Sequence, residues 1–98
     1  MKEITTAELQ QKLENGETVH LLDVREDDEV ASGKIPGAIH IPLGEVEERL
    51  EELDKAEPYV IICRSGGRSG RAAEFMEAQG YDATNMVGGM LDWQGEVE

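Results

Sequence analysis

The sequence predicts a parallel α/β fold, and two observations support this prediction. Strand-like apolar runs alternate with helix-like segments along the whole chain, as in a parallel sheet with helical crossovers. Three of the runs end at Asp23, at Cys63 and at a glycine turn after Met86. Ligands of such sheets bind beyond the carboxyl ends of the strands, so these positions are candidates for one shared pocket. The 98 residues contain no internal repeat or linker, and we expect residues 1–98 to form one domain.

The first predicted helix and strand lie in the amino-terminal quarter of the chain. Residues 5–8, TTAE, form a capping box in which Glu8 stands three residues after the N-cap Thr5. Leu9 and Leu13 then share one helical face, and the Asn-Gly pair that follows ends the helix. Residues 19–24 are mostly apolar and predict the first strand.

A second helix–strand unit follows. Residues 26–31 predict a short helix that Gly33 closes, and residues 35–37 predict a turn. Residues 38–41 predict a short strand that Pro42 terminates, because proline lacks the backbone N–H that a strand needs.

The clearest amphipathic helix begins at Pro42 or Leu43. Its apolar face carries residues at helical spacing, namely Leu43, Val46, Leu50 and Leu53. Its solvent-facing side carries five glutamates, namely Glu45, Glu47, Glu48, Glu51 and Glu52.

The last third of the chain contains the central strand. Residues 59–62 are apolar and predict this strand, and a helix follows Ser69 and is capped by Gly80. Residues 82–86 predict a weaker strand, and residues 87–93 predict a tight turn with one helical turn after it.

Composition excludes several classes of function. The chain has 22 acidic and 9 basic residues, with a formal net charge of −13, so we expect neither nucleic acid nor a membrane as partner. One cysteine and two histidines without close spacing argue against a structural zinc site, and we expect no metal and no cofactor. The first residues lack the apolar core of a secretory signal, and a lone cysteine suits a reducing compartment. We therefore expect a cytoplasmic protein.

Cys63 is the strongest candidate for a reactive residue. It stands where the central strand meets a glycine-containing loop and a helix, a junction that directs backbone N–H groups at one point. Arg64, Arg68 and Arg71 are close by, and residues 58–73 contain no Asp or Glu. Both features lower the pKa of a thiol and favour a thiolate that handles an anion. The alternative is a buried, inert cysteine, which is the commoner fate of a lone cysteine.

Other readings of the loop fail on its residues. A phosphate-binding G-x-x-x-x-G-K-[ST] motif is absent, because no lysine lies between Lys55 and the carboxyl terminus. Ser69 does not fit the G-x-S-x-G elbow of serine hydrolases, because position 71 is arginine.

Four segments resemble the rhodanese family of single-domain sulfurtransferases. Residues 63–69, CRSGGRS, resemble its active-site loop, and residues 23–26, DVRE, resemble its first signature. Residues 33–42 resemble its second signature, with Lys34 where a histidine is usual, and residues 87–93 resemble its closing motif. The resemblance implies a three-layer α/β/α fold with a central five-stranded parallel sheet. It also implies sulfur transfer through a persulfide on Cys63.

The implied chemistry assigns roles to the loop. Cys63 attacks the outer sulfur of a donor such as thiosulfate, and cyanide or a thiol acceptor then removes that sulfur. The persulfide lies among backbone N–H groups, and Gly66 and Gly67 permit the positive φ angles that such a ring demands. The expected binding residues are Arg64, Ser65, Gly66, Gly67, Arg68 and Ser69, and the expected supporting residues are Asp23 and Arg25. Arg64 guides the anionic donor. Arg68 points either to the anion or back to a carboxylate such as Asp23.

Two alternatives remain beside sulfur transfer. Cysteine phosphatases and arsenate reductases use a similar loop with five residues between cysteine and arginine, whereas only four separate Cys63 from Arg68. The shorter ring suits one sulfur atom better than a tetrahedral oxyanion. The second alternative is a sulfur-carrier or docking module that serves one protein partner.

Overall fold

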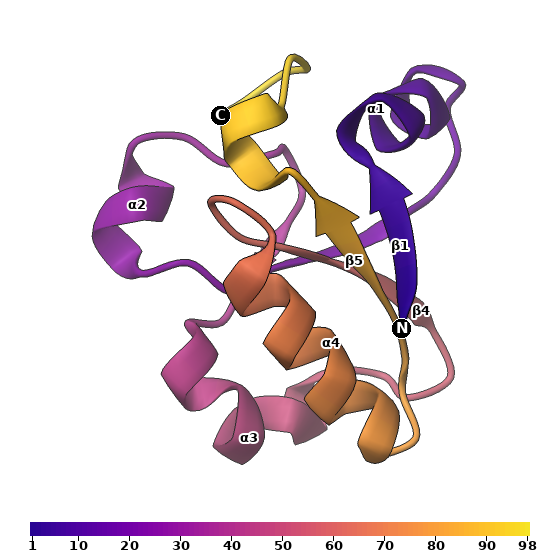
Figure 1. Cartoon of the computed structure of the whole chain (residues 1–98), viewed down its shortest axis with the longest axis vertical. Coiled ribbons are helices and arrows are strands. Elements are labelled where there is room, and N and C mark those ends of the chain that lie inside the picture. The colour runs from indigo at the N-terminus through magenta and orange to yellow at the C-terminus, as the bar shows by residue number, and fades with distance from the viewer.

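A five-stranded parallel sheet forms the centre of the computed structural model, which describes all 98 residues (Figure 1). The strand order is β1-β5-β4-β2-β3, and every neighbouring pair is parallel. The strands are β1 (Lys2–Thr5), β2 (His20–Asp23), β3 (Ile39–His40), β4 (Pro58–Ile62) and β5 (Asp82–Val87). The parallel α/β prediction is confirmed, and so is the five-stranded sheet that the family resemblance implied.

Helices cover both faces of the sheet. The α-helices are α1 (Thr6–Glu14), α2 (Asp27–Ala31), α3 (Val46–Arg49) and α4 (Gly67–Ala78), and the 3-10 helices are η1 (Leu43–Glu45), η2 (Leu50–Glu52) and η3 (Gly89–Asp92). Figure 1 shows α3 and α4 grouped together, with α1 apart from them. No helix is long and apolar enough to cross a lipid bilayer.

The central strand β4 divides its side chains between two apolar clusters. Val60 and Ile62 pack into a cluster with residues of α1, whereas Ile61 and Cys63 pack into a cluster with residues of α3 and α4. Successive side chains of a strand point to opposite faces, so this division follows from the strand geometry. Cys63 consequently lies on the face that α4 covers.

The predicted capping box at the first helix is present. The Thr5 hydroxyl accepts a hydrogen bond from the Glu8 N–H at 3.0 Å, and the Glu8 carboxylate accepts one from the Thr5 N–H at 2.9 Å. The helix ends at Glu14 with Asn15 as its C-cap, and Gly16 follows with φ of 78°. The two bonds satisfy backbone donors that a helix start leaves unpaired.

Two elements differ from the sequence-based expectations. The residue pattern located four strands, and the fifth is β1, an edge strand in which only Ile4 is partly buried. The helix expected from residue 43 to residue 53 is instead three short pieces, η1, α3 and η2. Gly44 is a poor helix former, and the repeated glutamates repel one another at i,i+4 spacing. Its apolar face is nevertheless as expected, because Val46 and Leu53 are buried.

Candidate active site

Cys63 lies directly after β4, at the carboxyl edge of the sheet. The residue is 1% exposed. The sulfur is nevertheless in contact with the loop that follows, since the Gly66 N–H donates to Sγ at 3.0 Å. Gly66 has φ of 102° and is the N-cap of α4, which begins at Gly67, three residues earlier than the sequence indicated. Cys63 is therefore buried, but its sulfur is still in contact with the backbone of the loop, as expected from the sequence.

Ser69 gives the sulfur a second polar neighbour. It lies in the first turn of α4, is fully buried, and its hydroxyl is 3.3 Å from Cys63 Sγ. Burial raises the pKa of the Cys63 thiol, but hydrogen bonds from Ser69 and from the N–H groups of Gly66 and Ser65 lower it further than burial raises it. The net effect is a pKa below the ordinary value, which favours the thiolate.

The glycine turn after β5 supports the cysteine loop from the other side. Gly89 has φ of +59°, and a Cβ there would lie 2.4 Å from the carbonyl carbon of Arg64. The N–H groups of Met90 and Leu91 donate to the carbonyls of Cys63 and Arg64 at 2.9 and 3.0 Å. These carbonyls are thereby held by η3, while the loop's N–H groups remain available to the sulfur.

Arg68 points to a carboxylate, but that carboxylate is not Asp23. Its guanidinium donates to both oxygens of Glu29, at 2.7 and 2.8 Å. Hydrogen bonds from Arg68 are the main reason that the pKa of Glu29 falls to about 2. The pair joins α2 to the first turn of α4. Nothing in the sequence distinguished Glu29 from the other 21 acidic residues, because the pairing joins segments 39 positions apart.

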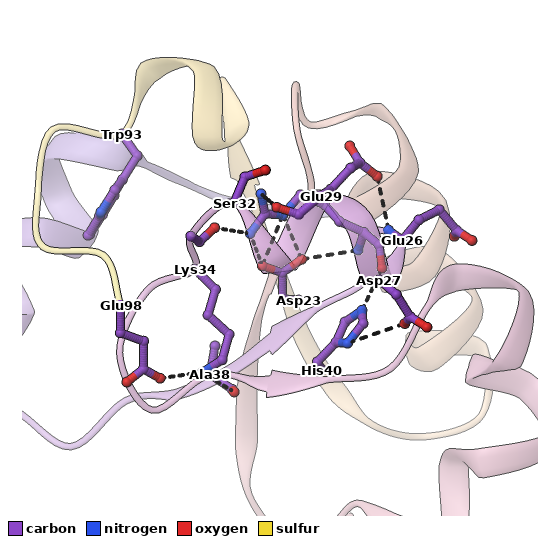
Figure 2. Close-up of polar contacts among 12 residues, drawn as sticks. Asp23, Glu26, Asp27, Glu29, Ser32, Lys34, Ala38, His40, Trp93 and Glu98 are labelled. Carbon is purple, nitrogen blue, oxygen red and sulfur yellow. Dashed lines mark hydrogen bonds and ion pairs between the residues drawn. The ribbon is translucent and has the colours of Figure 1, made fainter.

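Asp23 and Arg25 form a buried ion pair that makes no hydrogen bond to the sulfur. The side chain of Asp23 is fully buried and accepts from Arg25 Nη2 at 2.7 Å. Arg25 also donates to the carbonyls of Glu29 and Gly33, at 3.3 and 2.8 Å. Figure 2 shows Asp23 beside the helix that carries Glu29, with His40, whose Nε2 lies 2.7 Å from the Arg25 carbonyl, next to it. The pair therefore positions α2 and, through it, the partner of Arg68.

Lys34 has a structural contact at the position where the related signature has histidine. Its ammonium donates to the carbonyl of Ala38 at 3.2 Å and to the carboxylate of Glu98 at 2.5 Å (Figure 2). Backbone hydrogen bonds at 3.2 and 2.8 Å also join Lys34 and Glu98. Lys34 thus ties the turn before β3 to the last residue of the chain.

Three residues of the loop are exposed, namely Arg64, Ser65 and Gly67. The expectation of a positive φ holds for Gly66 and is wrong for Gly67, which begins α4 with helical backbone and has open space where a Cβ would lie. Gly67 therefore does not need to be glycine for the loop to close.

The unpaired cations are concentrated at this loop. Six of the nine basic residues lie within 4.0 Å of a carboxylate, namely Lys2, Lys12, Arg25, Lys34, Arg49 and Arg68. The three without such a partner are Lys55, Arg64 and Arg71. Two of these three flank the cysteine loop, so Arg64 is free to meet an anion, and Arg71 is an exposed helix residue.

Two surface hollows lie away from the cysteine. One, of about 540 Å³, is lined by residues of α1, of the turn before β3 and of the carboxyl-terminal segment. The other, of about 380 Å³, lies between α3, η2 and the end of α4. Neither includes a residue of the cysteine loop.

Asn85 is a site residue that sequence reasoning missed. It lies on β5, is 4% exposed, and its side chain contacts both Ser69 and the carbonyl of Gly66. The only available signal was a polar residue inside a strand-like run, which is too common to single out.

The fold and the site define a class: a parallel α/β protein with a single cysteine beside an amide-lined loop at the carboxyl edge of its sheet. The profile of the family described as Rhodanese-like domain matches residues 5–96. The chain belongs to the rhodanese-like domain family, as its sequence resemblance implied.

Curated relatives carry names from sulfur chemistry. "Putative sulfurtransferase YtwF" of Bacillus subtilis (strain 168) is 49% identical, and the match covers 100% of this chain and 95% of that protein. "Putative sulfur carrier protein YrkF" of the same organism is 46% identical over 98% of this chain, which spans about half (52%) of its length. "Thiosulfate sulfurtransferase PspE" of Escherichia coli (strain K12) is 36% identical over 74% of this chain and 72% of that protein. These names support sulfur transfer in general.

A solved structure with the same fold is a rhodanese-like domain protein from Staphylococcus aureus. It is 44% identical and superimposes with a TM-score of 0.94, over 100% of this chain and 97% of that chain. This agreement covers every element described above.

Proposed function

We propose that this protein moves sulfane sulfur from thiosulfate, or from a persulfide donor, to a thiol acceptor or cyanide, through a persulfide on Cys63. The observation that carries the proposal is the contact of Cys63 Sγ with the Gly66 N–H at 3.0 Å, at the start of α4. A thiolate held there by backbone donors is both a nucleophile and the anchor for a second sulfur.

The first step is a displacement at sulfur. The Cys63 thiolate attacks the outer sulfur of thiosulfate, the new S–S bond forms, and the bond to the sulfonate breaks with release of sulfite. Sulfite takes the electron pair of the broken bond and is a stable, weakly basic anion. No general acid is needed, and the loop offers none.

The second step returns the thiolate. A deprotonated acceptor thiol, or cyanide, attacks the outer sulfur of the persulfide, and the Cys63 thiolate leaves. Between the two steps the outer sulfur carries the negative charge. The N–H groups of the loop and the start of α4 stabilise this charge, because they are already oriented before it develops.

The position of Arg68 supports sulfur over phosphate as the group that the loop holds. A cysteine phosphatase needs its loop arginine on the oxyanion, whereas Arg68 donates to both oxygens of Glu29. The ring between Cys63 and Arg68 also has only four residues. Phosphate-ester cleavage gains from an acid that protonates the leaving oxygen, and no such acid contacts Cys63.

A sulfur-carrier role is the second candidate, and one observation favours it. The relative YrkF, 46% identical to this chain, is named a sulfur carrier protein, and this chain spans 52% of it. The same Cys63 persulfide serves a carrier, which differs only in passing its sulfur to one protein partner. Exposed Arg64 beside the loop suits either a small anionic donor or an acidic partner surface.

We propose a cytoplasmic location, because the single cysteine has no disulfide partner within the chain and stays available as a thiol in a reducing compartment.

Incubation with thiosulfate followed by intact-mass measurement tests the proposal. The wild type is expected to gain the mass of one sulfur atom, and Cys63→Ser is expected to gain none. A reducing agent that cleaves persulfides should remove the added mass. Hydrolysis of an aryl phosphate without any gain of sulfur would instead favour the phosphatase. Transfer from the loaded protein to a small thiol separates a general transferase from a carrier that serves one partner.

A further inference from the structure

The hydroxyl of Ser69 lies between two acceptors. It is 2.5 Å from Asn85 Oδ1 and 3.3 Å from Cys63 Sγ. A serine hydroxyl has one proton to donate, so it serves one of these acceptors at a time. The exposed fractions of Ser69, Asn85 and Cys63 are 0%, 4% and 1%, which leaves bulk water little access to replace the missing bond.

The orientation of the Asn85 amide follows from its other partner. Its Nδ2 lies 3.1 Å from the carbonyl oxygen of Gly66, which can only accept a hydrogen bond. The amide oxygen therefore faces Ser69 and must be the acceptor there. At 2.5 Å this bond is at the short end of the range for O–H···O contacts, so the Ser69 proton belongs to Asn85 when Cys63 is a neutral thiol. The Ser69 oxygen, 3.3 Å from Sγ, then has free lone pairs that can accept the thiol proton.

Ionisation of Cys63 changes the balance. The thiolate has no proton to give and gains from the Ser69 proton, but turning that proton to Sγ leaves the buried Asn85 oxygen without a donor. From this competition we infer that Asn85 is a positioning residue that limits the ionisation of Cys63 through Ser69. The inference rests on the proposed role of Cys63 as the sulfur nucleophile. It adds a consequence for that role: once the charge has moved to the outer sulfur, Ser69 can donate to Asn85 again.

The charged groups around Cys63 do not account for this effect. Ser69 and Asn85 do not titrate, so the competition is between hydrogen bonds. The charged side chains on the elements that surround the sulfur include Arg64 of the loop, Arg68, Arg71, Glu74 and Glu77 of α4, Glu26 and Glu29 at α2, Asp23 and Arg25 at the end of β2, and Asp92 of η3. None of them contacts Ser69 or Asn85, and the substitutions below leave them all in place.

Titration of the thiolate by its ultraviolet absorbance tests the inference, and Cys63→Ser supplies the blank. The chain has a single cysteine, so the signal reports on Cys63 alone. Asn85→Leu removes the competing acceptor and is expected to move the midpoint to lower pH. The carbonyl of Gly66 keeps a donor in this variant, because the Gly70 N–H also reaches it at 3.1 Å. Ser69→Ala removes the donor and is expected to move the midpoint to higher pH.

The double variant distinguishes the proposed relay, in which Asn85 acts on Cys63 through Ser69, from a general loosening of the loop. In the Ser69→Ala background, Asn85→Leu is expected to cause no further downward shift. A midpoint that rises or stays unchanged in Asn85→Leu overturns the inference, and so does an equal downward shift without Ser69. As a second measure, the alkylation rate of Asn85→Leu below the midpoint should rise about threefold, because the gain in thiolate exceeds the loss of nucleophilicity.

A measurement on the wild type covers the case in which Asn85→Leu does not fold. The carbon signal of the Asn85 side-chain carbonyl should shift in an NMR titration with the same midpoint as the thiolate, since that oxygen loses its donor. A signal that does not move overturns the inference. None of these readouts uses a sulfur donor. A wild type that shows them but gains no sulfur from thiosulfate would disprove the proposed function and leave the relay standing.

Discussion

Arg68 and Glu29 form a two-bond ion pair, at 2.7 and 2.8 Å, that turns the loop's second arginine toward α2. Two charged side chains that could both have faced the sulfur loop satisfy each other instead. The pair is about one quarter exposed on each side, so water screens it only in part.

Glu29→Gln tests whether this pair keeps oxyanions out of the loop. Without the carboxylate, Arg68 is free to swing toward the amide-lined ring. Inhibition of sulfur loading by phosphate or arsenate should then strengthen by about three- to tenfold, measured as the inhibition constant. Glu74→Gln, an exposed carboxylate on the same helix as Arg68, is the matched control and should leave the constant unchanged. Equal inhibition in Glu29→Gln and the wild type would mean that Arg68 does not reach the ring.

The same pair predicts how stability depends on pH. Folding lowers the pKa of Glu29 from 4.5 to about 2, so its stabilising contribution is complete above pH 4.5 and is lost as the pH falls toward 2. The free energy of unfolding of Glu29→Gln should therefore lie about 1 kcal/mol below that of the wild type at neutral pH. Urea titrations at several pH values should show the two proteins converging near pH 2. A constant difference across that range would contradict the assignment.

Arg64→Ala should weaken the use of thiosulfate without removing the nucleophile. The unpaired guanidinium attracts the dianion, so its loss is expected to raise the thiosulfate KM by about five- to tenfold and to flatten the dependence of KM on salt. Arg71→Ala removes the other unpaired arginine near the loop and serves as the control for general surface charge. Arg64 has no part in donor binding if the two variants have the same KM.

Gly89→Ala should be among the most damaging single methyl additions in the chain. A Cβ would lie 2.4 Å from the Arg64 carbonyl carbon, and φ is +59°. Gly16→Ala is a matched control, because Gly16 also has a positive φ, of 78°, but nothing within 4 Å of a Cβ. We expect losses in the free energy of unfolding of about 1 kcal/mol at Gly16 and at least about 3 kcal/mol at Gly89. Similar losses at both sites would show that the loop yields to the clash.

Asp23→Asn should destabilise the fold more than removal of the whole ion pair. The single change leaves the buried guanidinium of Arg25 without its carboxylate, at a cost of about 3–5 kcal/mol in urea titrations. The double variant Asp23→Leu with Arg25→Met leaves no charge behind and should recover part of that loss. The residues act independently if the loss in the double variant equals the sum of the losses in Asp23→Leu alone and Arg25→Met alone.

Much of the fold was predictable because its signals are local. The capping box at Thr5 and Glu8 and the apolar run of β4 each occupy a few consecutive residues. The edge strand β1 was missed because three of its four residues are exposed, so burial left no apolar pattern in the sequence. Its strand character comes from pairing with β5, which lies some 80 positions away.

The residues of the candidate site also fall into two groups, those with a local signal in the sequence and those without one. Cys63, Gly66 and Ser69 were predicted because a strand, a glycine loop and a helix start follow one another in the sequence. Glu29 and Asn85 were missed because each reaches the loop from another element, and nothing near them in the sequence marks that contact. The partner of Arg68 was left open between an anion and Asp23, and only the packing of α2 on α4 identifies Glu29.

Cys63 belongs to the same buried apolar cluster as Ala73 and Met76 of α4. The candidate reactive residue is therefore also part of the packed interior of the protein. If sulfur loading occurs as proposed, the added atom enters close-packed surroundings, where one extra heavy atom alters stability. The empty and loaded forms would then melt at different temperatures. The melting temperature alone would then report whether Cys63 carries a second sulfur atom, without any assay of transfer.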